Sequence, residues 1–118
     1  MQFPATELVL DSKGAVYHLG LQPDQLANKI ILVGDQDRVA KISRFFDSVA
    51  HRIQHREFVS HTGYYQGKHI TVLSTGIGTD NIDICMAELD ALANIDLQLR
   101  EEKPVKTGLE ITRIGTCG

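Results

Sequence analysis

Residues 30–38, with the sequence IILVGDQDR, constrain the fold more than any other part of this chain. Four consecutive apolar residues between polar ones predict a strand that is buried on both faces, as in a parallel sheet covered by helices. Gly34 then allows backbone N–H groups to approach a ligand without an intervening side chain. Because open α/β sheets bind ligands beyond the carboxyl ends of their strands, we expect a binding edge here.

Composition restricts the class of protein. The chain has 118 residues, of which 42% are hydrophobic, and this predicts one globular domain over residues 1–118. A net charge of -3 gives no overall field that would attract nucleic acid or a membrane, so neither is an expected partner. No apolar run approaches the ~20 residues that span a bilayer, and no signal-peptide pattern opens the chain, which predicts a cytoplasmic location. Cys85 and Cys117 belong to no zinc or paired-cysteine motif and are expected to be reduced.

The first third of the chain is predicted to run from an irregular segment into a strand and a helix. Residues 1–20 have no helical or strand period, and we expect a loop or an N-terminal arm that can reach another subunit. Pro23 and Asp24 predict one helical turn before the strand. After the strand, apolar residues recur at helical spacing, and Asp35 or Asp37 can cap the helix. These apolar positions are Val39, Ile42, Phe45 and Phe46.

The rest of the chain continues the α/β pattern with one antiparallel insertion. Residues 48–65 alternate polar and apolar side chains loosely and predict antiparallel strands. Residues 68–74 predict a second buried strand, followed by a glycine loop and a helix. Residues 97–109 are polar and predict a loop, and residues 110–118 predict a third strand that ends in a third glycine turn. The apolar stripe of the second helix consists of Ile82, Cys85, Met86, Leu89 and Leu92 or Ala93.

Three strand ends carry the groups that an anion site requires. Parallel neighbours would bring together Gly34 with Arg38, the loop of residues 74–81, and Arg113 with Thr116. Arginine presents paired donors in the plane of an oxyanion, and glycine backbone N–H groups add further donors. The alternative is that each glycine serves only a turn and each arginine only a surface ion pair. The chain contains no dinucleotide fingerprint, P-loop, zinc-hydrolase or serine-hydrolase motif.

Two histidines are spaced four residues apart, as metal ligands on a helix would be. His51 and His55 fall in the segment that is predicted to be a strand, where this spacing does not face one ligand. We therefore expect two exposed or half-buried imidazoles without a metal.

Five ordered motifs resemble the nucleoside phosphorylase family, and within it the uridine phosphorylases. The resemblance implies a mixed β-sheet flanked by helices, and it implies phosphorolysis of uridine or a related nucleoside to the free base and ribose 1-phosphate. Whether uridine or a purine nucleoside is preferred stays open. The motifs are YHLGL at 17–21, VGDQDRV at 33–39, HREF at 55–58, STGIG at 74–78 and RIGTCG at 113–118.

The resemblance also implies roles for single residues. Arg56 would be donated to the phosphate site of a neighbouring subunit, and His18 would reach the ribose 5'-hydroxyl of that subunit. This implies a homo-oligomer, a dimer or a hexamer of dimers, with shared sites for nucleoside and phosphate. The remaining phosphate ligands that it implies are Gly34, Arg38, Arg113 and Thr116.

A monovalent cation is the only metal that the resemblance implies. Glu57 and Ile77 match positions of a potassium site at the subunit interface, and Asn81 stands where the family usually has serine. No other cofactor is implied. Inorganic phosphate is the implied co-substrate.

The resemblance assigns this chain to the N-terminal part of a longer enzyme. Residues 97–109 look like a loop inserted relative to shorter relatives. The groups that hold the base and the ribose hydroxyls would lie in the remaining part, so we expect the chain alone to be inactive or nearly so. Two alternatives stay open: a non-catalytic anion-binding or oligomerisation module, and a hydrolytic nucleosidase. The three arginines favour phosphate over water as the nucleophile, because they would hold an oxyanion without protonating it.

Overall fold

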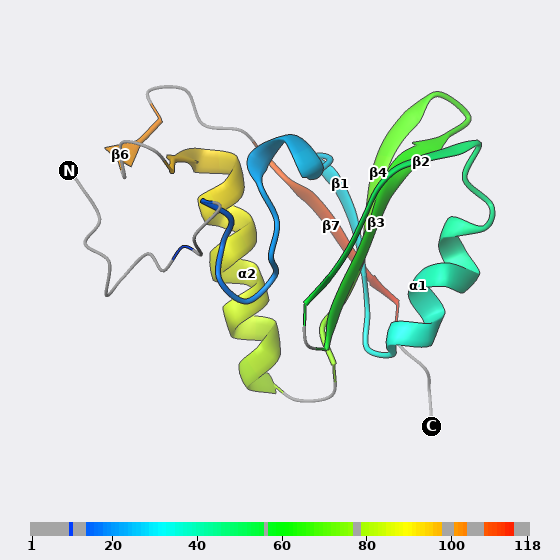
Figure 1. Ribbon diagram of the computed structural model, residues 1–118, viewed down its shortest axis with the longest axis horizontal. Coiled ribbons are helices and arrows are strands. Elements are labelled where there is room, and N and C mark those ends of the chain that lie inside the picture. Colours follow the sequence, from blue (N-terminus) through cyan, green and yellow to red (C-terminus); the bar gives the residue numbers. More distant parts are fainter. Residues whose placement is uncertain are drawn as a thin grey trace.

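Five strands form one mixed sheet in the order β2-β3-β4-β1-β7 (Figure 1). The computed structural model describes residues 10, 14–55, 57–76, 79–97, 101–103 and 108–114. The five strands are β1 (Lys29–Val33), β2 (Ser48–His55), β3 (Phe58–Tyr65), β4 (Lys68–Ser74) and β7 (Glu110–Ile114). The predicted α/β fold with an antiparallel insertion is therefore confirmed.

The three strands that precede the glycine turns are parallel neighbours. β1 lies between β4 and β7 and pairs in parallel with both, so that Val33 is opposite Ser74 on one side and Ile114 on the other. β3 is antiparallel to β2 and to β4, and β2 therefore runs in the same direction as β4. The carboxyl ends of β1, β2, β4 and β7 consequently share one edge of the sheet.

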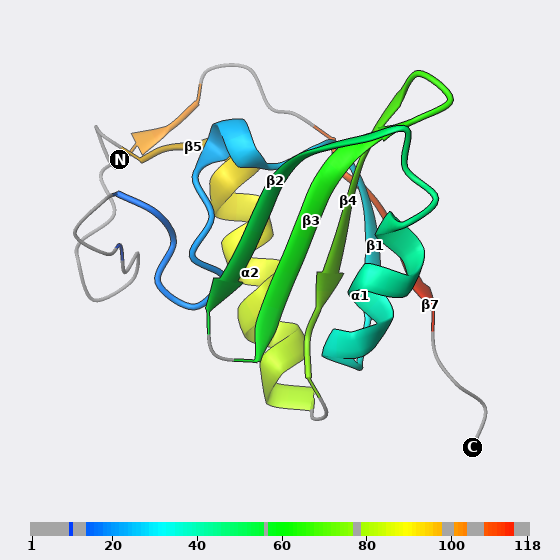
Figure 2. The ribbon, with the colours of Figure 1, turned by 45° about the vertical axis from the view of Figure 1, so that its right-hand side comes forward.

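The two helices cover opposite faces of the sheet, as Figures 1 and 2 show. α1 (Gln36–Ser43) packs on β3 and β4, where Val33, Val39 and Val72 are buried. α2 (Thr79–Asn94) lies on the other face over the larger core. Both helices begin at the edge where the parallel strands end. The larger core contains Val16, Leu19, Leu21, Ile30, Leu32, Phe58, Leu73, Cys85, Leu89, Ala91, Leu92 and Leu97.

Two predicted apolar positions are wrong. The first helix ends at Ser43, and the side chain of Phe45 beyond it is 62% exposed, with the guanidinium of Arg44 4.8 Å from the centre of its ring. Met86 of the second helix is 42% exposed, although it follows the buried Cys85. Helical spacing places Met86 at the border of the stripe, where a side chain is less covered than at its centre.

Residues 14–20 before β1 are irregular, as predicted, but they are packed; the other residues of the predicted arm, except residue 10, lie outside the described residues. A backbone bond from the Val16 N–H to the Leu21 carbonyl closes a loop, and both side chains are fully buried. The turn η1 (Pro23–Gln25) follows, as Pro23 predicts. Apolar side chains in an irregular loop have no period, so their burial leaves no pattern in the sequence.

A small strand pair lies at the start of the predicted loop of residues 97–109, with one strand before the loop and the other within it. β5 (Ile95–Asp96) continues directly from α2 and pairs antiparallel with β6 (Glu101–Glu102). The Lys103 N–H donates to the Asn94 carbonyl and closes the pair onto the helix end. Strands of two residues are too short to show an alternation. None of the helices among the described residues has the length and apolar character needed to cross a membrane.

A histidine ties α1 to the sheet and makes stability depend on pH. His61 of β3 lies 2.7 Å, through Nδ1, from the Ser43 hydroxyl at the end of α1. Burial, and second the nearby Arg52 guanidinium, lower the pKa of His61 below its ordinary value of 6.5. At pH values between the lowered pKa of the folded state and 6.5, His61 binds more protons in the unfolded chain than in the folded one. The stability that neutral His61 contributes is therefore complete above pH 6.5 and is lost as the pH falls through this range.

We expect His61→Gln to remove this part of the pH dependence. Glutamine can still hydrogen-bond the Ser43 hydroxyl but does not titrate. Urea unfolding at pH 8 and pH 5 should therefore show a smaller loss of unfolding free energy on acidification in the variant. An equal loss in both proteins would remove His61 as the cause.

Candidate functional site

The turns after β1 and β4 lie against each other at the shared edge. The Thr75 N–H donates to the Val33 carbonyl at 2.8 Å, which continues the pairing of the strands into the turns. A Cβ on Gly34 would lie 3.8 Å from the Gly76 carbonyl oxygen. Gly76 has a φ of 75°, which favours glycine. The backbone of both turns is thus accessible without a side chain at either glycine.

The start of α1 carries the predicted cap and the first candidate arginine. Asp35 is the N-cap, and its side chain accepts the Asp37 N–H at 2.9 Å. The Arg38 N–H donates to the Asp35 carbonyl at 3.1 Å. These bonds use amides that would otherwise face an anion. The Gly34 backbone and the side chain of the half-buried residue Arg38 therefore remain as the donors that this turn could offer an anion.

The second candidate arginine lies on β7, the strand next to β1. Arg113 is exposed and pairs with Leu32 in the register of β1 and β7. Paired residues of neighbouring strands share a face, and Leu32 belongs to the core under α2. Arg113 therefore lies on the α2 side of the sheet, and Arg38 belongs to the helix on the other side. The two arginines therefore belong to opposite sides of the sheet, near the edge where β1 ends at Gly34.

The turn between β2 and β3 lies at this edge as well. The Ser74 hydroxyl, at the end of β4, donates to the Glu57 carbonyl at 2.9 Å and accepts the Val59 N–H at 2.8 Å. Glu57 is half-buried. Asn81 is in the first turn of α2, at the same end of the sheet, but its side chain is outside the described part.

Three other predicted site residues fall outside the described residues: Arg56, Ile77 and Thr116. Their proposed roles in phosphate and cation binding stay predictions. Among the residues that the structure describes, no group of three or more His, Cys, Asp or Glu side chains could hold a metal ion.

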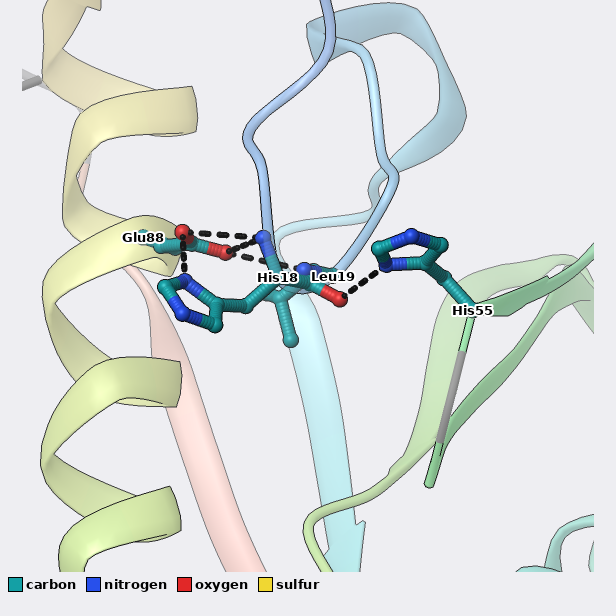
Figure 3. A network of polar contacts seen from close by, with 4 residues as sticks. All are labelled: His18, Leu19, His55 and Glu88. Carbon is teal, nitrogen blue, oxygen red and sulfur yellow. Dashed lines mark hydrogen bonds and ion pairs between the residues drawn. The ribbon is translucent and has the colours of Figure 1, made fainter. Parts of the chain in front are cut away.

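His18, the predicted ribose contact, is held by a glutamate that the sequence did not single out. Figure 3 shows Glu88 of α2 facing the backbone and the ring of His18. The His18 Nδ1 lies 2.9 Å from Glu88 Oε2, and the Leu19 N–H donates to Glu88 Oε1 at 2.9 Å. The His18 side chain is 33% exposed and that of Glu88 only 13%. Glu88 borders the apolar stripe of α2, and a carboxylate in that position is the signal that could have indicated a partner.

The second histidine of the predicted strand pair contributes to the same contact. His55 is at the end of β2, and its Nδ1 lies 2.9 Å from the His18 carbonyl oxygen. As predicted, His51 and His55 are half-buried strand residues. The ring of Tyr17 lies edge-on to the rings of His18 and His55.

The cysteine in α2 does not serve as a nucleophile. Cys85 is fully buried in the core. Burial, and second the charge of Glu88, raise the pKa of its thiol to about 12. The reactive thiolate is therefore scarce at neutral pH, and Cys85 acts as a small apolar side chain.

The chain matches one family over most of its length. Residues 28–118 match the family described as the phosphorylase superfamily. A uridine phosphorylase of Thermococcus kodakarensis is 35% identical over 111 residues, which cover 93% of this chain and 40% of that protein. A uridine phosphorylase of Escherichia coli is 41% identical over 109 residues, covering 91% of this chain and 38% of that protein. This chain thus spans about two fifths of the length of these relatives.

Solved structures agree with this match. A nucleoside phosphorylase of Trypanosoma brucei, described as showing uridine phosphorylase activity, superposes with a TM-score of 0.85 and 37% identity. The match covers 94% of this chain and 39% of that chain. A purine nucleoside phosphorylase of Toxoplasma gondii superposes with a TM-score of 0.70 and 26% identity, covering 93% of this chain and 39% of that chain.

Proposed function

This chain belongs to the phosphorylase superfamily, and from this premise we propose that it supplies the phosphate-binding part of a nucleoside phosphorylase. The observation that carries the proposal is the meeting of β4, β1 and β7, which brings the Gly34 turn between the elements that bear Arg38 and Arg113. Relatives described as uridine phosphorylases support the class of reaction. Uridine or a related nucleoside and phosphate are the proposed substrates.

The proposed chemistry explains why arginines suit this edge. Phosphate attacks C1' of the ribose while the base leaves, through a transition state with oxocarbenium character. The phosphate must be held in place and must keep its negative charge. A guanidinium does both, because it donates two parallel hydrogen bonds and does not give up its proton near neutral pH. Arg38 and Arg113 are the proposed donors of this chain, together with the Gly34 backbone and Thr116.

We propose that a second copy of the chain completes the phosphate-binding part of the site. We propose that Arg56 of a neighbouring subunit adds a third guanidinium and that His18 of that subunit binds the ribose 5'-hydroxyl. Glu57, Ile77 and Asn81 are proposed for a potassium ion at the same interface. The proposed location of the assembly is the cytoplasm.

Turnover by this chain alone is proposed to be absent or very slow. It spans about two fifths of the length of its relatives, and the groups that hold the base are proposed to lie in the rest. The test is chromatographic detection of base released from uridine or inosine by the purified chain, with and without phosphate. Turnover that requires phosphate and is lost in Arg113→Ala would contradict inactivity but support phosphorolysis. Equal cleavage in phosphate-free buffer would contradict phosphorolysis and indicate a hydrolytic nucleosidase.

A further inference from the structure

We infer that Glu88 is a positioning residue for His18: its carboxylate fixes the loop of residues 17–19 and holds the His18 imidazole as the Nδ1–H tautomer, so that Nε2 is left as a hydrogen-bond acceptor for a ligand hydroxyl. The identity of that ligand depends on the proposed function, in which His18 contacts a ribose. The tautomer itself can be measured without phosphate or nucleoside.

One carboxylate receives three donors from two consecutive residues. Glu88 Oε1 accepts the Leu19 N–H at 2.9 Å and the His18 N–H at 3.1 Å. Glu88 Oε2 lies 3.2 Å from the same His18 nitrogen and 2.9 Å from His18 Nδ1. An ionised carboxylate has no proton to donate, so Nδ1 must carry the hydrogen in this contact. The geometry therefore places a hydrogen on His18 Nδ1, and a neutral His18 ring is then the Nδ1–H tautomer.

The His18 peptide is also held from its other side. The His55 Nδ1 lies 2.9 Å from the His18 carbonyl oxygen, which can only accept, so His55 is the donor and carries hydrogen on Nδ1. In Figure 3, Glu88 of α2 and His55 of β2 lie on opposite sides of the His18 backbone. Glu88 of the helix and His55 of the strand, which are 33 residues apart in sequence, thus fix one peptide unit between them.

The surrounding loop has little freedom to move away. The Gly20 N–H donates to the Val16 carbonyl at 2.9 Å, and the side chains of Val16 and Leu19 are buried in the core. Gly20 has a φ of 69°, and a Cβ on it would lie 3.2 Å from the Cβ of His55. The backbone beside His18 is therefore fixed, while its ring is one-third exposed. A fixed backbone and a defined tautomer together preorganise Nε2 as an acceptor.

A purely structural role for Glu88 makes a different prediction. If the carboxylate only caps the loop amides, the neutral ring of His18 is free to adopt either tautomer. The tautomer therefore separates positioning of the imidazole from simple loop stabilisation.

The test is long-range ¹H–¹⁵N NMR of the histidine rings in the 118-residue chain and in Glu88→Gln. Spectra are recorded at a pH where the ring ¹⁵N chemical shifts themselves identify neutral imidazoles. We expect mostly Nδ1–H for His18 in the unmodified chain. In the variant, the amide oxygen at the Oε1 position keeps the two backbone donors, and the NH₂ group at the Oε2 position faces Nδ1. Because that NH₂ group can only donate, His18 should convert to mostly Nε2–H.

Internal and matched controls accompany this comparison. His55 should remain Nδ1–H in both proteins, since its partner is a carbonyl. Asp83→Asn removes a charge from an exposed position of the same helix and should leave the His18 tautomer unchanged. A predominant Nε2–H tautomer in the unmodified chain would overturn the inference even if Glu88→Gln failed to fold. An unchanged Nδ1–H tautomer in a folded Glu88→Gln variant would also overturn it.

Discussion

Replacing Gly63 by alanine is expected to unfold the chain or to lower its unfolding free energy by about 3 kcal/mol or more, the upper end for overpacked sites. A Cβ at this position would lie 2.1 Å from the Ser48 carbonyl oxygen and 2.9 Å from the Cα of Val49. Both atoms are backbone of β2, where the register with β3 shifts between Val49 and His51. The strand would have to separate from β3 to make room. Because whole domains are stable by only about 5–15 kcal/mol, the loss would be a large fraction of the total.

Two other glycines separate this steric effect from the general effect of losing a glycine. A Cβ on Gly67 would have no atom within 4 Å, but Gly67 has a φ of 80°, which strains an alanine backbone. We expect Gly67→Ala to lower the unfolding free energy by about 1–2 kcal/mol. Gly108 is exposed and also has no atom within 4 Å, so Gly108→Ala should change stability by less than about 0.5 kcal/mol. Urea unfolding followed by circular dichroism ranks the three variants. If Gly63→Ala lost no more unfolding free energy than Gly67→Ala, β2 would make room for the Cβ without a steric penalty, and the prediction would be wrong.

Removing both candidate arginines is expected to abolish phosphate binding at the edge of the sheet. A hydrogen bond to a charged group contributes about 1.5–3 kcal/mol, so each single variant, Arg38→Ala or Arg113→Ala, should weaken phosphate affinity by roughly tenfold or more. Arg38→Ala/Arg113→Ala should reduce it below detection. The measurement is the ³¹P line width of phosphate titrated with the chain at constant ionic strength.

The matched control is an arginine at the other end of α1. Arg44 packs its guanidinium on the Phe45 ring, beyond the last helical residue. Arg44→Ala removes the same charge from the same segment and should leave phosphate affinity within about twofold. The reason is that salt screens the interaction of an exposed charge at the far end of α1 with a phosphate at the other end. A loss in Arg44→Ala equal to that in Arg113→Ala would indicate binding by net charge alone.

Local sequence patterns predicted most of the fold. The apolar run before Gly34, the β-branched run of residues 68–74 and the cap at Asp35 each depend on neighbours in sequence, and all three are found in the structure. Phe45 was wrongly predicted as an apolar position of the helix, because it continues the helical spacing beyond Ser43, where α1 ends. The side-by-side order of the parallel strands depends on crossovers that no local pattern encodes.

The candidate site was predicted only in part for the same reason. Gly34, Arg38 and Arg113 follow or end strands, so the parallel arrangement was enough to bring their elements together. The contact between His18 and Glu88 spans 70 residues. It joins an aperiodic loop to the border of a helix, and it could not be found without the packing of α2 on that loop.

The most direct test of the proposed phosphate site is a phosphate titration of the ¹⁵N-labelled chain followed by amide chemical shifts, with chloride at matched ionic strength as the control. We expect saturable shifts centred on Gly34, Arg38 and Arg113, small shifts at Arg44, and loss of saturation in Arg113→Ala. Absence of saturable shifts at these three residues, or an unchanged titration in Arg113→Ala, would contradict a phosphate site at the ends of β1 and β7.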